Sequence, residues 1–160
     1  MKEGRMSRAE AATALILEVF RLNGALLAAG DGLTRDLGLT SARWQVLGAV
    51  SLAGRPLTVA GAARAMGLTR QAVRRLVTEL TADGFVALAP NPDHRRAALV
   101  VLTESGRRAY AAASERQAAW AERIARGCEP AALDDATTLL RRLRAALERD
   151  EEQAAPETGS

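Results

Sequence analysis

The sequence has few of the side chains that enzymes use for chemistry. Among its 160 residues there is one histidine, one cysteine and only 3% aromatic residues. A single cysteine cannot form a disulfide within the chain, and neither a Cys/His metal-binding pattern nor a glycine-rich phosphate loop is present. We therefore expect no catalytic activity, no metal and no cofactor, and an enzyme is the weaker alternative.

The sequence is also expected to contain no long apolar run. No stretch is expected to approach the ~20 apolar residues that a membrane span needs. The segment Met1–Arg8 has no continuous apolar stretch behind its charges, as a signal peptide would have. Because a lone cysteine fits a reducing compartment, these absences together predict a cytoplasmic protein without a membrane partner.

What the chain does contain is abundant alanine and arginine. Hydrophobic residues make up 48% of it, which is enough for a core, and alanine favours a mainly α fold. Residues 40–108 hold 10 arginines and 4 acidic residues, for a charge of +6, whereas residues 109–160 hold 7 arginines and 10 acidic residues, for a charge of −3. Positive charge gathered in one region indicates a polyanionic partner, and an arginine-rich surface with no partner is the alternative.

The segment from Leu57 to Gly84 is the most informative part of this basic region. It reads as a short apolar helix that ends at Gly67, followed by a second helix that Thr69 can cap. Two short helices joined by a tight turn that contains glycine, the second basic on its outer face, are typical of a helix-turn-helix. Apolar residues of the second helix recur at i, i+3, i+4 and i+7 and are expected to form its buried face. They are Val73, Leu76, Val77 and Leu80.

Such a second helix fits the major groove of DNA, where side chains near its N-terminus reach the edges of the bases. Arginine can bond to guanine O6 and N7 together, and glutamine can pair with adenine. An ordinary solvent-exposed face is the alternative, and the short helix before it and the hairpin after it make that alternative weaker. The predicted DNA-binding residues of this helix are Thr69, Arg70, Gln71, Arg74, Arg75 and Thr78.

A β-hairpin is expected directly after this helix. The runs Phe85–Leu88 and Leu99–Leu102 have strand composition, and the polar stretch between them contains two prolines. A mobile hairpin of this kind is a wing, and it can place an arginine in the minor groove of DNA. On the loop alone, an ordinary polar turn is favoured. The candidate wing residues are Asp93, His94, Arg95 and Arg96.

Apolar helices are expected on both sides of this module. The first spans about residues 8–29, where Gly30-Asp31-Gly32 is expected to stop it, and the last spans about residues 131–150. The module cannot cover both apolar stripes, so we expect these helices to form a dimer, with a bundle inside one chain as the alternative. The predicted organisation is a mainly α, winged helix-turn-helix fold with a two-stranded wing: residues 1–35 an N-terminal dimerisation helix, 36–103 the DNA-binding domain, 104–150 C-terminal dimerisation helices, and 151–160 a disordered tail.

Three short runs carry a resemblance to a known family. The runs Gly67–Val73, Asn91–Ala97 and Leu102–Gly106 resemble those of the MarR family of bacterial winged-helix regulators. In that family the wing carries Asp-x-Arg-Arg/Ser-Ala, followed by a strand that ends in Leu-Thr. The resemblance implies a homodimer on a pseudo-palindromic DNA site. It also implies that Arg95 enters the minor groove while Asp93 orients it. The matching residues are Asp93, Arg95, Arg96, Ala97, Leu102 and Thr103.

The resemblance further implies regulation by a small aromatic or amphipathic effector, and Trp44 is the candidate for lining its pocket. Cys128 does not match the peroxide-sensing cysteine of the family, which lies near the N-terminus, so we expect an inert thiol. The resulting hypothesis is a DNA-binding repressor that an effector releases from its operator. A winged-helix module for protein–protein assembly, without sequence-specific DNA binding, is the alternative.

Overall fold

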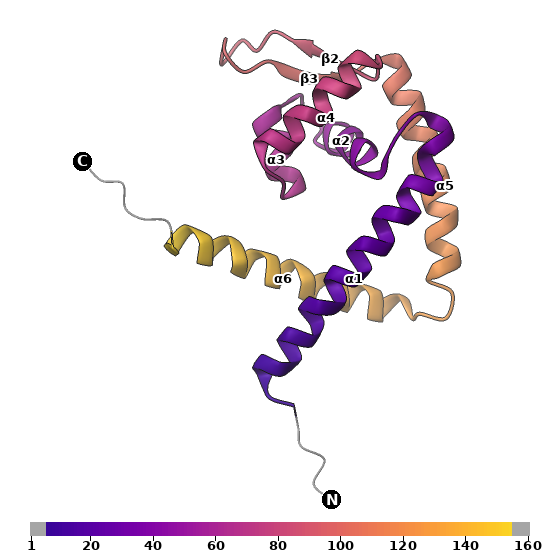
Figure 1. Ribbon diagram of the computed structural model, residues 1–160, viewed down its shortest axis with the longest axis vertical. Coiled ribbons are helices and arrows are strands. Elements are labelled where there is room, and N and C mark those ends of the chain that lie inside the picture. The colour runs from indigo at the N-terminus through magenta and orange to yellow at the C-terminus, as the bar shows by residue number, and fades with distance from the viewer. Residues whose placement is uncertain (1–5, 155–160) are drawn as a thin grey trace, which may run out of the picture. The chain divides into compact units, whose positions relative to one another are not determined.

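The computed structural model describes residues 6–154 of the chain. The chain forms two compact units, residues 1–119 and 120–160, and the boundary falls inside the helix α5 (Glu104–Ile124). Figure 1 follows the chain from the first helix in indigo to the last in yellow. The fold is mainly α, with one small antiparallel sheet, as the sequence predicts.

The first helix, α1 (Arg8–Thr34), begins at a capping box. The Ser7 N–H donates to Glu10 Oε2 (2.7 Å), and the Ser7 hydroxyl accepts from the Glu10 N–H (3.2 Å). These two hydrogen bonds satisfy backbone groups that the start of a helix leaves unpaired. The Ser7 N–H, which donates to the Glu10 carboxylate, holds the pKa of this carboxyl below its usual value, and the Ser7 side chain lowers it further.

The prediction that Gly30-Asp31-Gly32 stops α1 is wrong, because α1 continues to Thr34. A Cβ at Gly30 would lie 2.5 Å from the Ser41 hydroxyl oxygen, so glycine lets α1 approach the next helix closely. The Ser41 N–H donates to Asp31 Oδ1 (2.6 Å), and the buried Thr34 hydroxyl donates to the Gly30 carbonyl (2.8 Å). Tertiary contacts therefore outweigh the low helix propensity of glycine here.

A short 3₁₀ helix, η1 (Arg35–Leu37), follows α1 and is tied to α5 by an ion pair. Arg116 donates from both terminal nitrogens to the Asp36 carboxylate (2.5 and 2.8 Å) and also to the Leu33 carbonyl (2.9 Å). The hydrogen bond from Arg116 holds the pKa of the Asp36 carboxyl below its usual value, and the same bond raises the pKa of Arg116. This fork-shaped pair fixes the end of α1 against α5.

Three helices form the core of the winged module, and each begins at a threonine whose hydroxyl accepts a backbone hydrogen bond. The cap at Thr69 confirms the sequence prediction, and the same capping preference, which can be read from the sequence, predicts Thr40 and Thr58 at the starts of the other two helices. Gly67 has a φ of +64°, which lets the chain turn sharply between the second and third of these helices. The three helices are α2 (Ser41–Leu52), α3 (Val59–Met66) and α4 (Arg70–Ala82).

The sheet contains the predicted hairpin and one strand that was not predicted. Strands β2 (Val86–Ala89) and β3 (Leu99–Leu102) pair antiparallel, and β1 (Leu57–Thr58) pairs with the other edge of β3. With only two residues, β1 is too short to show an alternating pattern in the sequence. The two-stranded wing is therefore anchored by a third strand that leads directly into α3.

The core of this module is apolar and continuous. Val46 and Leu47 of α2, Val73 and Leu80 of α4, and Val100 of β3 are fully buried. The four predicted inward residues of α4 are all buried, which confirms its predicted orientation. Burying one face of α4 leaves its basic face in solvent.

Helix α1 is more apolar than we expected. Together with η1 it spans Arg8–Leu37 and contains an 18-residue window with a mean hydropathy of 1.5, so the prediction that no stretch approaches a membrane-spanning length is wrong. One such helix is weak evidence for a membrane span, since apolar helices covered by protein have the same composition. Its large side chains that are more than a third exposed are Ile16, Leu17, Phe20, Leu22, Leu26 and Leu27.

The second unit contains the end of α5 and the helix α6 (Pro130–Ala154). The first four residues of the predicted disordered tail, residues 151–154, belong to helix α6, and residues 155–160 lie outside the described part of the chain. Several of its apolar residues are exposed: Leu133, Leu139, Leu140 and Leu147. The functional roles predicted for the terminal helices remain predictions.

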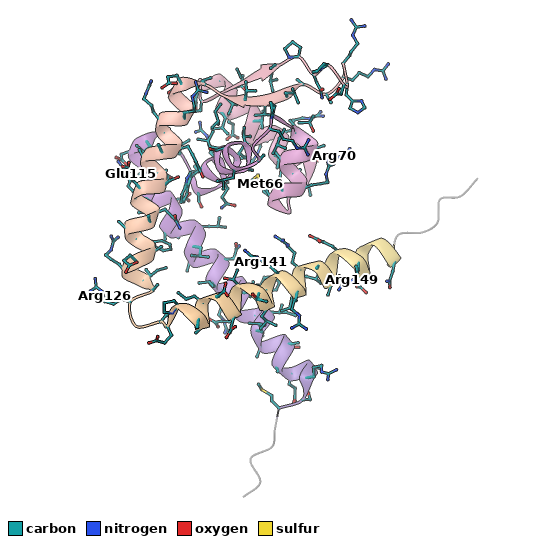
Figure 2. All side chains as sticks on the ribbon, turned by 180° about the vertical axis from the view of Figure 1, so that it is seen from behind. Met66, Arg70, Glu115, Arg126, Arg141 and Arg149 are labelled. Carbon is teal, nitrogen blue, oxygen red and sulfur yellow. The ribbon has the colours of Figure 1, made fainter. Side chains whose placement is uncertain are left out.

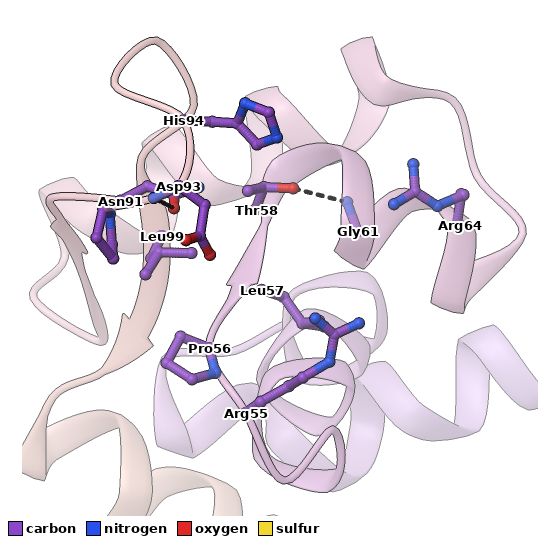
Figure 3. Close-up of a pocket in the computed structure, with 11 residues that line it drawn as sticks. Arg55, Pro56, Leu57, Thr58, Gly61, Arg64, Asn91, Asp93, His94 and Leu99 are labelled. Atoms are coloured by element: carbon purple, nitrogen blue, oxygen red, sulfur yellow. Dashed lines mark hydrogen bonds between the residues drawn. The ribbon is translucent and has the colours of Figure 1, made fainter.

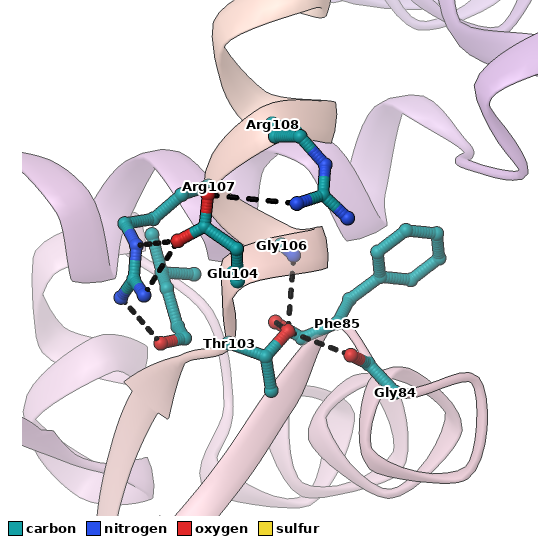
Figure 4. Close-up of polar contacts among 8 residues, drawn as sticks. Gly84, Phe85, Thr103, Glu104, Gly106, Arg107 and Arg108 are labelled. Carbon is teal, nitrogen blue, oxygen red and sulfur yellow. Dashed lines mark hydrogen bonds and ion pairs between the residues drawn. The ribbon is translucent and has the colours of Figure 1, made fainter.

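The start of α5 is packed tightly against the turn that follows α4 (Figure 4). The Thr103 hydroxyl donates to the carbonyls of Gly84 (2.7 Å) and Phe85 (3.1 Å) and accepts from the Gly106 N–H (3.0 Å). A Cβ at Gly106 would lie 1.9 Å from the Phe85 carbonyl oxygen, a distance that no side chain can occupy. The threonine and the glycine of the Leu-Thr-Glu-Ser-Gly run therefore have a structural role here.

We predict that Gly106→Ala lowers the free energy of unfolding by about 1–3 kcal/mol, because the added methyl group must push α5 away from the Phe85 carbonyl. The matched control is Gly32→Ala inside α1, where a Cβ meets nothing within 4 Å and alanine is the better helix former. Urea unfolding at a fixed protein concentration measures both. Equal stability of the Gly106 variant and the wild type would contradict the close packing.

Candidate nucleic-acid interface

Helix α4, the predicted recognition helix, presents all of its predicted DNA-binding side chains to solvent. Thr69, Arg70, Gln71, Arg74, Arg75 and Thr78 are exposed, and Figure 2 labels Arg70 near the start of the helix. The apolar face on the other side is packed against the core. Because the two faces alternate with the helical repeat, the burial of one determines the exposure of the other.

The six exposed residues of α4 are not equivalent. The Thr69 hydroxyl already accepts from the Ala72 N–H (3.2 Å), and the Thr78 hydroxyl donates to the Arg74 carbonyl (3.0 Å). Arg75 Nε lies 3.9 Å from Glu79 Oε1, which partly neutralises its charge. In the part of the chain that the structure describes, Arg70 and Arg74 have no carboxylate partner, so they are the uncompensated cations of this helix.

The wing loop is held in shape by an asparagine that sequence reasoning missed. Asn91 Nδ2 donates to the Ala97 carbonyl (2.9 Å), and Asn91 Oδ1 accepts from the Asp93 N–H (3.0 Å). The Ala97 N–H donates to the His94 carbonyl (2.9 Å). An asparagine two residues before an aspartate in a polar turn is a recognised signal for such a side-chain-to-backbone turn, and it could have been used.

The tip of the wing is exposed and basic. Asp93, His94, Arg95 and Arg96 are all exposed. Asp93 and Arg95 form no ion pair in the structure, so the orientation of Arg95 by Asp93 remains a prediction. Only the backbone of Asp93 is held, by Asn91.

A groove of about 420 Å³ brings the recognition helix and the wing together. Arg70, Arg74 and Thr78 form one side of it, and Arg96 and the residues that follow it form the other. The start of α3 and Leu88 of β2 also line this groove. Of the other predicted residues, Asp93 and His94 line a separate hollow beside the wing loop, and Arg95 lines a shallow depression with Pro90 and Pro92.

The positive charge of the module is only partly compensated. Of the 10 arginines in residues 40–108, four lie within 4.0 Å of a carboxylate: Arg43 with Asp83, Arg75 with Glu79, and Arg107 and Arg108 with Glu104. The other six have no such partner in the described structure, and all are exposed. These unpaired arginines are Arg55, Arg64, Arg70, Arg74, Arg95 and Arg96.

The structure offers little support for other chemistry at this surface. Among residues 6–154, no group of three or more His, Cys, Asp or Glu side chains could hold a metal ion. Trp44 is half-buried and packs against the apolar core, and its place in an effector pocket remains a prediction. Cys128 is exposed in the connection between α5 and α6.

Comparisons with known proteins agree with this arrangement. A family model described as "MarR family" matches residues 37–97. An uncharacterized protein of Mycobacterium tuberculosis, Rv2011c, is 44% identical over 133 residues, which cover 83% of this chain and 92% of that protein. The transcriptional activatory protein BadR of Rhodopseudomonas palustris is 31% identical over 106 residues, which cover 65% of this chain and 61% of BadR.

Solved structures share the fold over nearly the whole chain. The crystal structure of CouR from Rhodococcus jostii RHA1, bound to p-coumaroyl-CoA, has a TM-score of 0.66 and 26% identity, and covers 91% of this chain and 95% of CouR. Other structures with the same fold are described as regulators of the MarR family. The chain belongs to the MarR family of winged helix-turn-helix transcriptional regulators, which is not a family of enzymes.

Proposed function

We propose that this protein is a repressor that binds a pseudo-palindromic operator in double-stranded DNA as a homodimer. The observation that carries the proposal is the set of unpaired arginines on the exposed face of α4 and on the wing. Guanidinium groups without local carboxylates are free to replace the counterions of DNA phosphates, which is the main source of affinity for DNA. Family membership supports the same function.

Helix α4 and the wing are assigned to different grooves of the DNA. Helix α4 enters the major groove, where Arg70, Gln71 and Arg74 lie near its N-terminal end and reach base edges. The wing lies in the adjacent minor groove, where Arg95 and Arg96 meet a concentrated negative potential. The sugar-phosphate backbone that separates these two grooves then passes along the groove between α4 and the wing.

Two substitutions test this division. Arg74→Ala is expected to relax the preference for one base by about 1–3 kcal/mol, because a bidentate contact with guanine is lost.

Arg95→Ala is expected to weaken operator binding by up to a few kcal/mol at the flanking minor groove. Titrations of operator and random duplexes at several salt concentrations measure both effects, with Arg126→Ala as an exposed control of equal charge change.

Unchanged affinity and footprint in the Arg95 variant would remove that residue from the mechanism. Equal losses on operator and random DNA for the Arg74 variant would make Arg74 a phosphate contact. A wild-type protein without steep salt dependence on duplex DNA would instead favour the alternative, a module for protein–protein assembly. The DNA upstream of the protein's own gene is the first sequence to test for binding.

The homodimer follows from the uncovered apolar side chains of α1 and α6. A symmetric partner covers such faces and places two winged modules on the two half-sites of an operator. Large apolar residues such as Phe20, which is 68% exposed, are accessible to such a partner. A dimer also accounts for the apolar composition of α1 without a membrane, and binding to chromosomal DNA places the protein in the cytoplasm.

We predict that Phe20→Glu converts the protein to a monomer and abolishes high-affinity operator binding, since a buried unpaired carboxylate opposes association. The matched control is Ala25→Glu, which adds the same charge to an exposed site on the side of α1 that carries Glu18 and Arg21. Sedimentation equilibrium gives the oligomeric state. A dimeric Phe20 variant with normal affinity would show that this part of α1 is outside the interface.

The proposed effector is a small aromatic or amphipathic molecule, and the ligand in the CouR structure, p-coumaroyl-CoA, is of this kind. An effector that prefers a dimer with wrongly spaced wings lowers operator affinity by its difference in affinity for the two states. Trp44 is the residue we propose to line its pocket.

Aromatic acids and their CoA thioesters are expected to reduce operator affinity by about 5–150-fold when one of them is the effector. Operator titrations with and without each compound measure this change, and Trp44→Phe is expected to weaken the response while sparing DNA binding. The same operator in a transcription assay gives the sign, which matters because the relative BadR is an activatory protein. Equal affinity with every compound would indicate a constitutive DNA binder.

A further inference from the structure

A second basic hollow lies beside the wing, and it joins Asp93 and His94 of the wing to two arginines that have no assigned role. Its volume is about 350 Å³, and its walls come from the connection between α2 and β1, from α3, and from the start of the wing loop (Figure 3). Arg55 and Arg64 belong to this hollow, and they are the two unpaired arginines of the module that lie outside α4 and the wing.

Within the hairpin, the strand residues that line this hollow and the groove beside α4 project from opposite faces, and Thr58 of β1 lies between the two and lines both. Leu88 pairs with Val100, and Ala89 pairs with Leu99. Since neighbouring residues of a strand point to opposite faces, Leu88 and Leu99 project from opposite faces of the hairpin. Leu88 lines the groove beside α4, whereas Leu99 lines the second hollow.

The charges that face the second hollow favour an anion. Arg55 and Arg64 are exposed and have no carboxylate within 4.0 Å in the described structure. The hollow also contains His94 and one acid, Asp93, so two fixed positive charges face one negative charge. In Figure 3 the Arg55 and Arg64 side chains lie on one side of the hollow, with Asp93 and His94 on the wing side.

A wing that lies in the minor groove has a sugar-phosphate backbone on each of its two faces, because the groove is bounded by both strands. The arginines of the groove beside α4 face one of these strands. We propose that the hollow formed by Arg55, Arg64 and the wing loop binds a backbone phosphate of the other strand, across the minor groove. This inference rests on the proposed DNA-binding function and adds Arg55 and Arg64 to its contact surface.

The experiment compares the full-length Arg55→Ala, Arg64→Ala and double variants with the wild type on duplex DNA. The slope of log affinity against log salt is expected to become shallower by about 0.9 for each phosphate contact that is lost. Operator and random duplexes are expected to lose affinity by the same factor, because phosphate contacts carry no sequence information. Arg55→Lys and Arg64→Lys keep the charge and are expected to restore the slope.

Ethylation interference locates the phosphates. Arg96→Ala is expected to lose interference at phosphates of one strand. The double variant is expected to lose interference at phosphates of the other strand, across the minor groove. Thermal unfolding of each variant separates a loss of contact from a loss of folding, and Arg126→Ala controls for net charge.

A wild-type slope in the double variant, beside a shallower slope in Arg70→Ala or Arg95→Ala, would overturn this inference and leave the proposed function intact. An equal change in Arg126→Ala would also overturn it, because the effect would then come from net charge alone. Absence of any salt-dependent DNA binding by the wild type would overturn the proposed function itself.

Discussion

The placement of the DNA-binding elements depends on the close packing of one backbone carbonyl. The Phe85 carbonyl accepts from the Thr103 N–H (3.1 Å) and lies over Gly106, while the Phe85 N–H donates to the Leu80 carbonyl (2.9 Å). The Phe85 ring lies 5.7 Å from the guanidinium of Arg43, which pairs with Asp83 at the end of α4. The end of the recognition helix, the start of the wing and the start of α5 are therefore held at one point.

The distribution of acids decides which arginines remain without a carboxylate partner. An alanine- and arginine-rich composition alone leaves open whether the positive charge is functional or simply solvated. In the structure, Arg43 joins α2 to the end of α4 through Asp83, and Arg107 and Arg108 pair with Glu104 inside α5, whereas Arg70, Arg74 and Arg96 line the groove between α4 and the wing without a carboxylate partner. The position of the uncompensated positive charge, and not the total charge, therefore distinguishes this surface.

Local signals made much of the fold predictable from the sequence. The caps at Thr40, Thr58 and Thr69, the buried face of α4 and the hairpin depend on residues within a few positions of each other, so the sequence alone specified them. Gly30 inside α1 was misread because its role is a contact with Ser41 in another helix. The pair Arg55 and Arg64 was missed for a similar reason, since only the folded chain brings it next to the wing, whereas Asn91 carries a local turn signal that was overlooked.

The apolar surface of α1 also has a consequence for how the stability of the folded chain depends on its concentration. Any association that covers Phe20, Leu22 and their neighbours occurs in folded chains and not in unfolded ones, so mass action links the two equilibria. When the intracellular concentration of the protein is low, a newly made chain is then most susceptible to proteolysis and aggregation. Abundance itself becomes a protective factor, and a gene expressed at a very low level yields a more fragile product than one expressed well.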